Sequence, residues 1–193
     1  IARDQAVVEQ INDQHMNRAY LGEVALSPQL SATTRFDVLA DAELVLSAVP
    51  TQTTRGVLDG IEAVLKRQVP VIATAKGFEA VTLALQSEII AACWPDALPM
   101  VLSGPSFAVD VAAGRPTAVT LAGEEESRVR EVAETLASGT FRPYVSTDLT
   151  GVELAGGLKN VYALACGAVE GAGLGLSARS ALMARAHAEL TRL

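Results

Sequence analysis

Aromatic residues, cysteine and histidine are scarce in this chain. Only 4% of its 193 residues are aromatic although half are hydrophobic, so Ala, Val and Leu must build the interior. This composition is typical of α/β and all-α proteins, and the length allows one sizeable core or one domain with part of another. Cys93 and Cys166 lie far apart and show no metal-ligand spacing. We therefore expect no disulfide framework and no metal site, and a reducing, cytoplasmic setting.

Positive charge and long apolar runs are also scarce. The chain has 15 Lys and Arg against 22 Asp and Glu, which gives a net charge of −7. A nucleic-acid partner is therefore excluded, because binding to phosphates needs clustered Lys and Arg. Any anionic ligand must be held by a few local groups. No apolar stretch is long enough for a membrane span and the first residues show no signal-peptide pattern, so we expect a soluble protein.

Apolar runs alternate with amphipathic ones along the first three quarters of the chain. This alternation indicates βαβ units and predicts an α/β fold with a largely parallel sheet. The predicted strands are residues 44–49, 69–74, 100–102, 118–121 and 141–145. The predicted helices are residues 5–13, 36–41, 81–93 and 124–137 and a helix that is capped within 51–54 and runs through residue 66, with one or two turns within 107–113 and a loop over 17–33.

The amino-acid composition and its periodicity change after residue 147. Residues 151–175 are rich in glycine, and Leu154, Leu158, Val161 and Ala165 form a helical stripe, while residues 178–193 continue as a second helix. We predict two domains, a partial dinucleotide-binding domain over 1–147 and the beginning of an all-α domain over 148–193.

Small and polar residues follow the predicted strands. Lys76-Gly77 follows the strand 69–74, Ser103-Gly104-Pro105-Ser106 follows 100–102, and Val49-Pro50-Thr51 follows 44–49. Parallel strands bring their carboxyl ends to one edge of a sheet, where open α/β folds bind ligands. Each feature alone is weak, because a solvated loop lysine or a tight turn looks the same. Their convergence predicts a ligand site for a small polar substrate.

Lys159 stands in the glycine-rich helix among Ala155, Gly156 and Ala163. Small neighbours leave room for a ligand, and a partly desolvated lysine exchanges protons readily with a substrate oxygen. The alternative is a lysine that extends into solvent at the edge of the helix.

Arg3-Asp4 follows a segment that resembles the end of a strand. At such a position an Asp favours the free 2′-hydroxyl of NAD, and an Arg accommodates the 2′-phosphate of NADP. Both residues are present, so the choice between NAD and NADP stays open.

The order and spacing of several motifs resemble the bacterial type of NAD(P)-dependent glycerol-3-phosphate dehydrogenase. The resemblance covers essentially the whole chain and is far more specific than a single glycine motif. The matching segments are Ile11-Asn12, Asn17, Tyr20-Leu21, Ala48-Val49-Pro50, 75–79, 102–108, 113–118, 141–144, 151–154 and 157–161.

The resemblance implies a Rossmann-like, doubly wound domain and the reversible reduction of dihydroxyacetone phosphate to sn-glycerol 3-phosphate for phospholipid synthesis. It implies that Lys159 is the proton donor and acceptor, and that the substrate contacts Lys76, Gly104 and Ser106. The cofactor, NAD or NADP, would lie along Arg3, Lys76 and Ala108. A homodimer is compatible with this interpretation.

The family's glycine-rich loop after the first strand and its later substrate-phosphate motif are missing from the sequence, so we expect a piece of a longer enzyme that is incomplete by itself. Near the end, Ser177, Ala184 and Ala186 replace the family's usual Asn, Thr and Gly. Two alternatives stay open: a non-catalytic fragment or remnant of such a dehydrogenase, and a related 3-hydroxy acid dehydrogenase.

Overall fold

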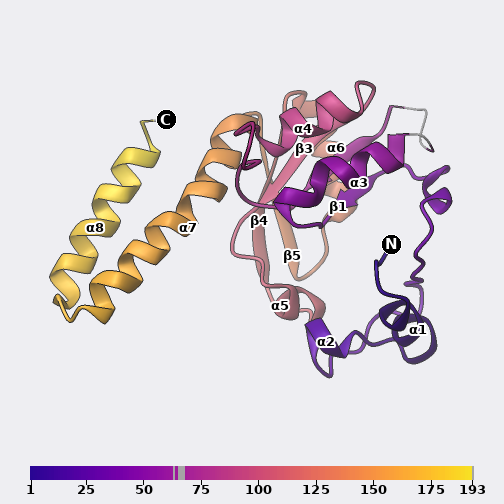
Figure 1. Cartoon of the computed structure of the whole chain (residues 1–193), viewed down its shortest axis with the longest axis horizontal. Helices are drawn as coiled ribbons and strands as arrows, with labels where there is room; N and C mark the ends of the chain where they lie inside the picture. Colours follow the sequence, from indigo (N-terminus) through magenta and orange to yellow (C-terminus); the bar gives the residue numbers. More distant parts are fainter. Residues whose placement is uncertain (63, 65–67, 193) are drawn as a thin grey trace.

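A five-stranded sheet forms the centre of the computed structural model, which describes residues 1–62, 64 and 68–192 (Figure 1). The strands follow the order β1-β2-β3-β4-β5, and their bounds are Val45–Ser47, Pro70–Ala73, Leu98–Ser103, Thr117–Gly123 and Phe141–Ser146. β1, β2 and β3 are parallel, β4 is antiparallel to β3, and β5 is parallel to β4. The predicted largely parallel sheet is therefore confirmed.

The strand directions bring three strand ends together. Ser47 of β1 pairs with Ala73 of β2, Ala73 pairs with Val101 of β3, and Ser103 ends β3. We call the edge formed by the carboxyl ends of β1, β2 and β3 the rim. The loops that begin with Thr74 and Gly104 both leave the sheet there, as the sequence predicts.

Helices cover both faces of the sheet. Along β2, Val71 and Ala73 face α3 (Thr54–Glu62) and α4 (Gln86–Cys93), and Ile72 packs on the opposite face with residues of α6 (Glu126–Leu136). Successive side chains of a strand point to opposite faces, so this four-residue strand contributes to both cores.

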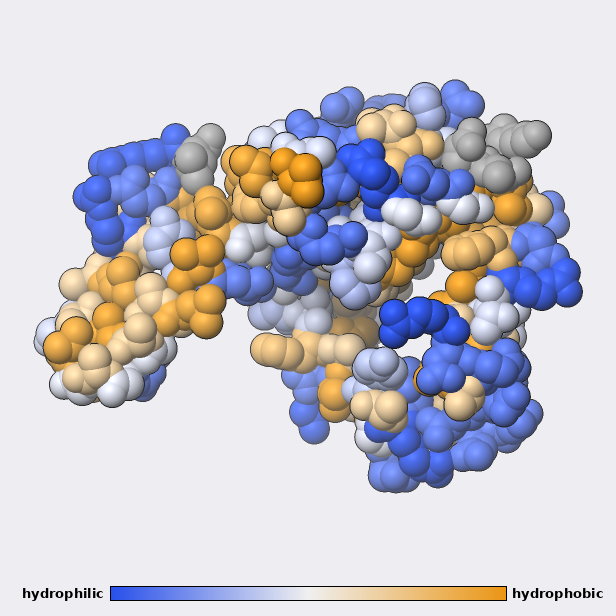
Figure 2. All heavy atoms as spheres, in the orientation of Figure 1, coloured by the Kyte–Doolittle hydropathy of each residue, from blue (hydrophilic) through white to orange (hydrophobic). Residues whose placement is uncertain are grey.

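The N-terminal segment and the C-terminal helices lie outside this sandwich (Figure 1). α1 (Gln5–Gln14) and α2 (Arg18–Leu21) lie beside the sheet, and α2 contacts α5 (Ala108–Ala112). α7 (Leu149–Gly171) and α8 (Gly175–Leu190) pack together as a hairpin that extends away from the sheet. Figure 2 shows much apolar surface on this hairpin, a property suited to packing against further protein. None of the helices in the described ranges is long and apolar enough to cross a membrane.

The predicted helix over 81–93 begins too early. Its first residues form a loop, and α4 begins at Gln86. Gln52 donates from its side chain to the Phe78 carbonyl and accepts from the Ala80 N–H, and Leu83 has a φ of 61°. These bonds hold the backbone of the loop in a non-helical path.

Smaller differences follow from local hydrogen bonding. The predicted loop 17–33 contains the four-residue α2, the predicted helix 36–41 shrinks to the 3₁₀ turn Asp37–Leu39, and another 3₁₀ turn, Thr51–Thr53, precedes α3. α3 ends at Glu62, and residues 63 and 65–67 of its predicted extension lie outside the described residues.

Candidate active site at the rim

α7 crosses the rim at a pair of glycines. A methyl group built on Gly156 would lie 2.9 Å from Ser103 Oγ, and one built on Gly157 would lie 3.3 Å from the Gly77 Cα atom. The helix backbone therefore approaches the end of β3 and the loop after β2 more closely than side chains would allow. Three predicted elements, Lys76-Gly77, Ser103 and the glycine-rich helix, meet at this point.

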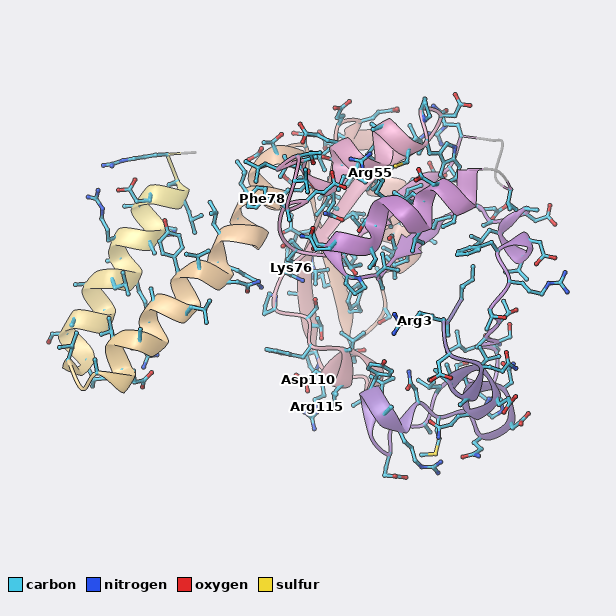
Figure 3. All side chains as sticks on the ribbon, in the orientation of Figure 1. Arg3, Arg55, Lys76, Phe78, Asp110 and Arg115 are labelled. Carbon is cyan, nitrogen blue, oxygen red and sulfur yellow. The ribbon has the colours of Figure 1, made fainter. Side chains whose placement is uncertain are left out.

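Lys76 is half-buried in the loop after β2 (Figure 3). Burial lowers the pKa of its ammonium group, and the charge of Lys159 lowers the pKa further. The two lysines thus lie close enough for their charges to interact. A pair of cations at one point favours an anionic ligand, since each negative charge relieves their repulsion.

Lys159 itself is exposed. The partial desolvation that the sequence analysis expects at Lys159 falls on Lys76 instead, because Lys76 is enclosed by the loop and α7 while Lys159 lies one helical turn beyond the close contact at Gly156. In the described part of the chain, Lys159 has no ion-pair partner and is open to a ligand from the solvent side.

The loop after β3 is shaped by Gly104, which has a φ of 150°. A Cβ atom on this residue would lie 3.0 Å from the Val119 Cα atom and 3.1 Å from the Ala118 carbonyl oxygen, so only glycine fits against β4. The N–H of Ser106 donates to the Gly104 carbonyl at 3.1 Å and closes the turn. Ser106 is half-buried near the rim.

A second set of contacts fixes the loop that carries Lys76. The Thr51 hydroxyl donates to the Lys76 carbonyl at 3.1 Å. The Arg55 guanidinium donates to both carboxylate oxygens of Glu79 at 2.8 and 2.9 Å, and this pairing, with a bond from Thr82, lowers the pKa of Glu79 to about 2. Arg55 is not predictable from the sequence, because no spacing pattern connects it to Glu79.

Arg3 and Asp4 have different environments. The Asp4 carboxylate caps α1 by accepting from the Ala6 N–H at 2.9 Å. Arg3 is exposed and, across the described residues, belongs to no ion pair. Figure 3 shows its side chain pointing from the N-terminal segment toward the sheet. Ala108 is also exposed, as the first residue of α5.

The sequence analysis also missed two buried polar residues beside the rim. Gln86 and Glu153 are 2% and 7% exposed. Together with Lys76, Ser103 and Gly156 they line a cavity of about 10 Å³. In the sequence, Gln86 and Glu153 are marked only by being polar residues within apolar helical segments. A broader hollow of about 600 Å³ lies elsewhere, along β5 and the start of α6, and contains no predicted site residue.

Among residues 1–62, 64 and 68–192, no group of three or more His, Cys, Asp or Glu side chains is placed to hold a metal ion.

Two family models match the chain. The model described as NAD-dependent glycerol-3-phosphate dehydrogenase N-terminus matches residues 1–129, and the one described as NAD-dependent glycerol-3-phosphate dehydrogenase C-terminus matches residues 148–193.

Curated relatives agree with these matches. A protein of Maricaulis maris named glycerol-3-phosphate dehydrogenase [NAD(P)+] is 45% identical over 97% of this chain and 56% of its own length. A protein of Rhodospirillum rubrum with the same name is 46% identical over 100% of this chain and 55% of its own length. The chain thus spans a little over half the length of these relatives.

Solved structures agree as well. The glycerol-3-phosphate dehydrogenase of Coxiella burnetii superposes with a TM-score of 0.89 at 30% identity, covering 98% of this chain and 58% of that structure. The enzyme of the same name from Plasmodium falciparum superposes with a TM-score of 0.91 at 26% identity, covering 98% and 54%. The Rossmann-like fold that continues into C-terminal helices is confirmed.

Proposed function

The chain belongs to the NAD-dependent glycerol-3-phosphate dehydrogenase family, and we propose that the whole protein interconverts dihydroxyacetone phosphate and sn-glycerol 3-phosphate with NAD or NADP. One observation carries the proposal beyond family membership: the Lys76 side chain lies against Gly156 of α7, Lys159 follows three residues later on that helix, and the charge of Lys159 lowers the pKa of Lys76. A small phosphate-bearing ketone supplies both the negative charge and the oxygen atom that such a pair can use.

We assign different roles to Lys76 and Lys159 because they differ in burial. Half-buried Lys76 holds a negative group of the substrate at the rim. Exposed Lys159 donates a proton to the carbonyl oxygen as the alcohol forms, and takes it back in the reverse reaction. When bound, the nicotinamide supplies the hydride that the carbonyl carbon accepts. Gly104 and Ser106 shape the wall of the substrate site, and the close approach of α7 holds both lysines on one side of it.

Exposed residues of the N-terminal segment and of the turn before α5 fit a dinucleotide. The exposed guanidinium of Arg3 suits a phosphate group, and exposed Ala108 and Phe107 offer a small and an aromatic surface for rings. Because the Asp4 carboxylate already caps α1, Arg3 is the better placed of the two residues to contact the adenosine ribose. We therefore expect the protein to accept NADPH at least as well as NADH.

The full-length protein tests the proposal directly. We expect it to oxidise NADPH or NADH in the presence of dihydroxyacetone phosphate, with little oxidation in the presence of a 3-keto acid of similar size. Comparable rates with the keto acid and none with the phosphate would assign the protein to the related 3-hydroxy acid dehydrogenases. No turnover with either substrate would favour the non-catalytic remnant.

Location and assembly belong to the same proposal. A cytoplasmic setting suits the free thiols of Cys93 and Cys166. A homodimer stays a prediction, which light scattering on the full-length protein can measure.

A further inference from the structure

The first turn of α4 is capped by a side chain from another helix. The residue at its N-cap, Leu85, has no polar side chain, so the free N–H groups of this turn need another acceptor. Glu153 of α7 supplies it: one carboxylate oxygen accepts from the Ser87 N–H at 2.9 Å and the other accepts from the Ser87 hydroxyl. We call these contacts between Glu153 and Ser87 the α4–α7 joint.

The α4–α7 joint is buried, so the Glu153 carboxylate loses its hydration when the protein folds. Glu153 is 7% exposed, and burial raises the pKa of its carboxyl group, while hydrogen bonds from Ser87 and from the Gln86 backbone oppose that rise. A buried carboxylate is tolerated only where hydrogen bonds and a favourable field compensate its lost hydration. The N-terminal end of α4 provides both.

On the α7 side, the joint lies at the same cavity as Lys76 and a few residues before Lys159. Gly156 and Gly157, the close-contact pair, follow Glu153 by three and four residues, and Lys159 follows by six. At about 1.5 Å per residue, Lys159 lies about 9 Å further along the same rigid helix. A shift or tilt of α7 at Glu153 is therefore transmitted to Lys159.

The α4 side of the joint also reaches the rim. The carbonyl oxygen of the Gln86 side chain accepts from the Thr54 hydroxyl at 2.8 Å. Its amide nitrogen has no hydrogen-bond partner among the described residues, and the side chain lines the same cavity as Lys76 and Ser103. One buried polar cluster thus connects α3, α4, α7 and the loop of Lys76.

We propose that Glu153 is a positioning residue, which sets the place of Lys159 relative to Lys76 by fixing α7 on the N-terminal end of α4. This inference rests on the proposed function for its kinetic consequences. Glu153 acts through the geometry of its two hydrogen bonds to Ser87, and not through the negative charge of its carboxylate.

Kinetics of the full-length protein separate positioning from simple stability. In Glu153→Ala we expect kcat to fall about tenfold or more, because Lys159 leaves its working position, while KM for the nicotinamide cofactor stays unchanged. Glu153→Gln keeps an acceptor for the Ser87 N–H and gains a donor for the Ser87 hydroxyl. It should restore kcat to within about threefold of the wild-type value.

Glu88→Ala is the matched control. Glu88 is exposed and accepts from the Leu85 N–H at 2.7 Å, so it caps the same end of α4; among the described residues it has no hydrogen bond to α7, and its charge raises the pKa of Glu153 without altering the two bonds to Ser87. We expect this variant to lose stability with an unchanged kcat. An equal fall of kcat in Glu88→Ala and Glu153→Ala would overturn the positioning role, as would a Glu153→Gln variant as slow as Glu153→Ala.

Hydrogen exchange keeps the two proposals distinguishable. We expect Glu153→Ala to speed the exchange of backbone amides in residues 149–159 relative to wild type, and Glu88→Ala to leave them unchanged. If the wild-type protein failed to reduce dihydroxyacetone phosphate, the proposed function would fall. The difference in amide exchange between Glu153→Ala and Glu88→Ala would still show whether Glu153 fixes α7 on α4. Unchanged exchange in folded Glu153→Ala, with unchanged kcat, would refute the inference.

Discussion

At the scale of single residues, the roles proposed for Lys76 and Lys159 follow from their different burial. The sequence analysis expects a desolvated lysine at position 159, but α7 and the loop after β2 enclose Lys76 and leave Lys159 exposed. A lysine whose charge is disfavoured by burial gains most when an anion binds beside it. An exposed lysine can approach and leave a reacting oxygen. Under the proposed function, the pair combines substrate binding and proton transfer in two neighbouring side chains.

The Arg55–Glu79 pair makes a prediction about pH. Glu79 has a pKa of about 2 in the folded protein, against about 4.3 for an ordinary Glu, so its contribution to stability is present above pH 5 and is lost as the pH falls toward 2. Glu79→Gln should lower the free energy of unfolding at pH 7, and its difference from wild type should shrink between pH 4.5 and 3. Denaturant titrations at several pH values measure this difference.

Glu131→Gln is the control for that series. Glu131 pairs with Arg128 at 3.0 Å, but both side chains are more than half exposed, so the pair should matter little at any pH. A Glu79→Gln difference that stayed constant down to pH 3 would show that the pair does not lower the pKa of Glu79.

At the scale of elements, close backbone approach builds the site, and glycine makes that approach possible. Gly104→Ala should destabilise the protein by about 2 kcal/mol or more, because its Cβ would meet the backbone of β4 and its φ disfavours a side chain. Gly56→Ala in α3 has open space around it and should stabilise the protein by about 0.5–1 kcal/mol. Thermal unfolding midpoints of the two variants, measured side by side, should move in opposite directions. Equal midpoints would contradict the packing described here.

The sequence alone predicts much of this architecture. Its alternation of apolar and amphipathic runs identifies all five strands and the long helices, because those segments bury one or both faces. It does not predict where α4 begins, since the bonds of Gln52 to residues 78 and 80 join segments far apart in the chain.

The site is predictable in part for the same reason. The convergence of Lys76 and Ser103 follows from strand order, and the structure confirms it. The buried Glu153 and the pairing of Arg55 with Glu79 depend on contacts between helices and loops, which no local pattern encodes. The division of the chain after residue 147 stays a prediction, and so do the individual roles of the site residues Arg3, Lys76, Gly104, Ser106, Ala108 and Lys159.

At the scale of the whole molecule, the sheet, the loops of the rim and α7 act together. The sheet aligns three strand ends, the loops after β2 and β3 carry Lys76 and Ser106, and α7 crosses the rim at its glycine pair with Lys159 about one turn further along. The hairpin of α7 and α8 extends from this point with exposed apolar surface. The proposed reaction therefore depends on how one long helix is seated on an α/β sandwich.

The most direct test of the central claim is the turnover of full-length Lys159→Met with dihydroxyacetone phosphate and NADPH or NADH. Methionine keeps much of the side-chain bulk and removes the ammonium group, so kcat should fall on the order of 100-fold while the unfolding midpoint stays near the wild-type value. A folded Lys159→Met protein with wild-type kcat would contradict the account, because Lys159 would then be a solvent-exposed lysine with no part in the reaction.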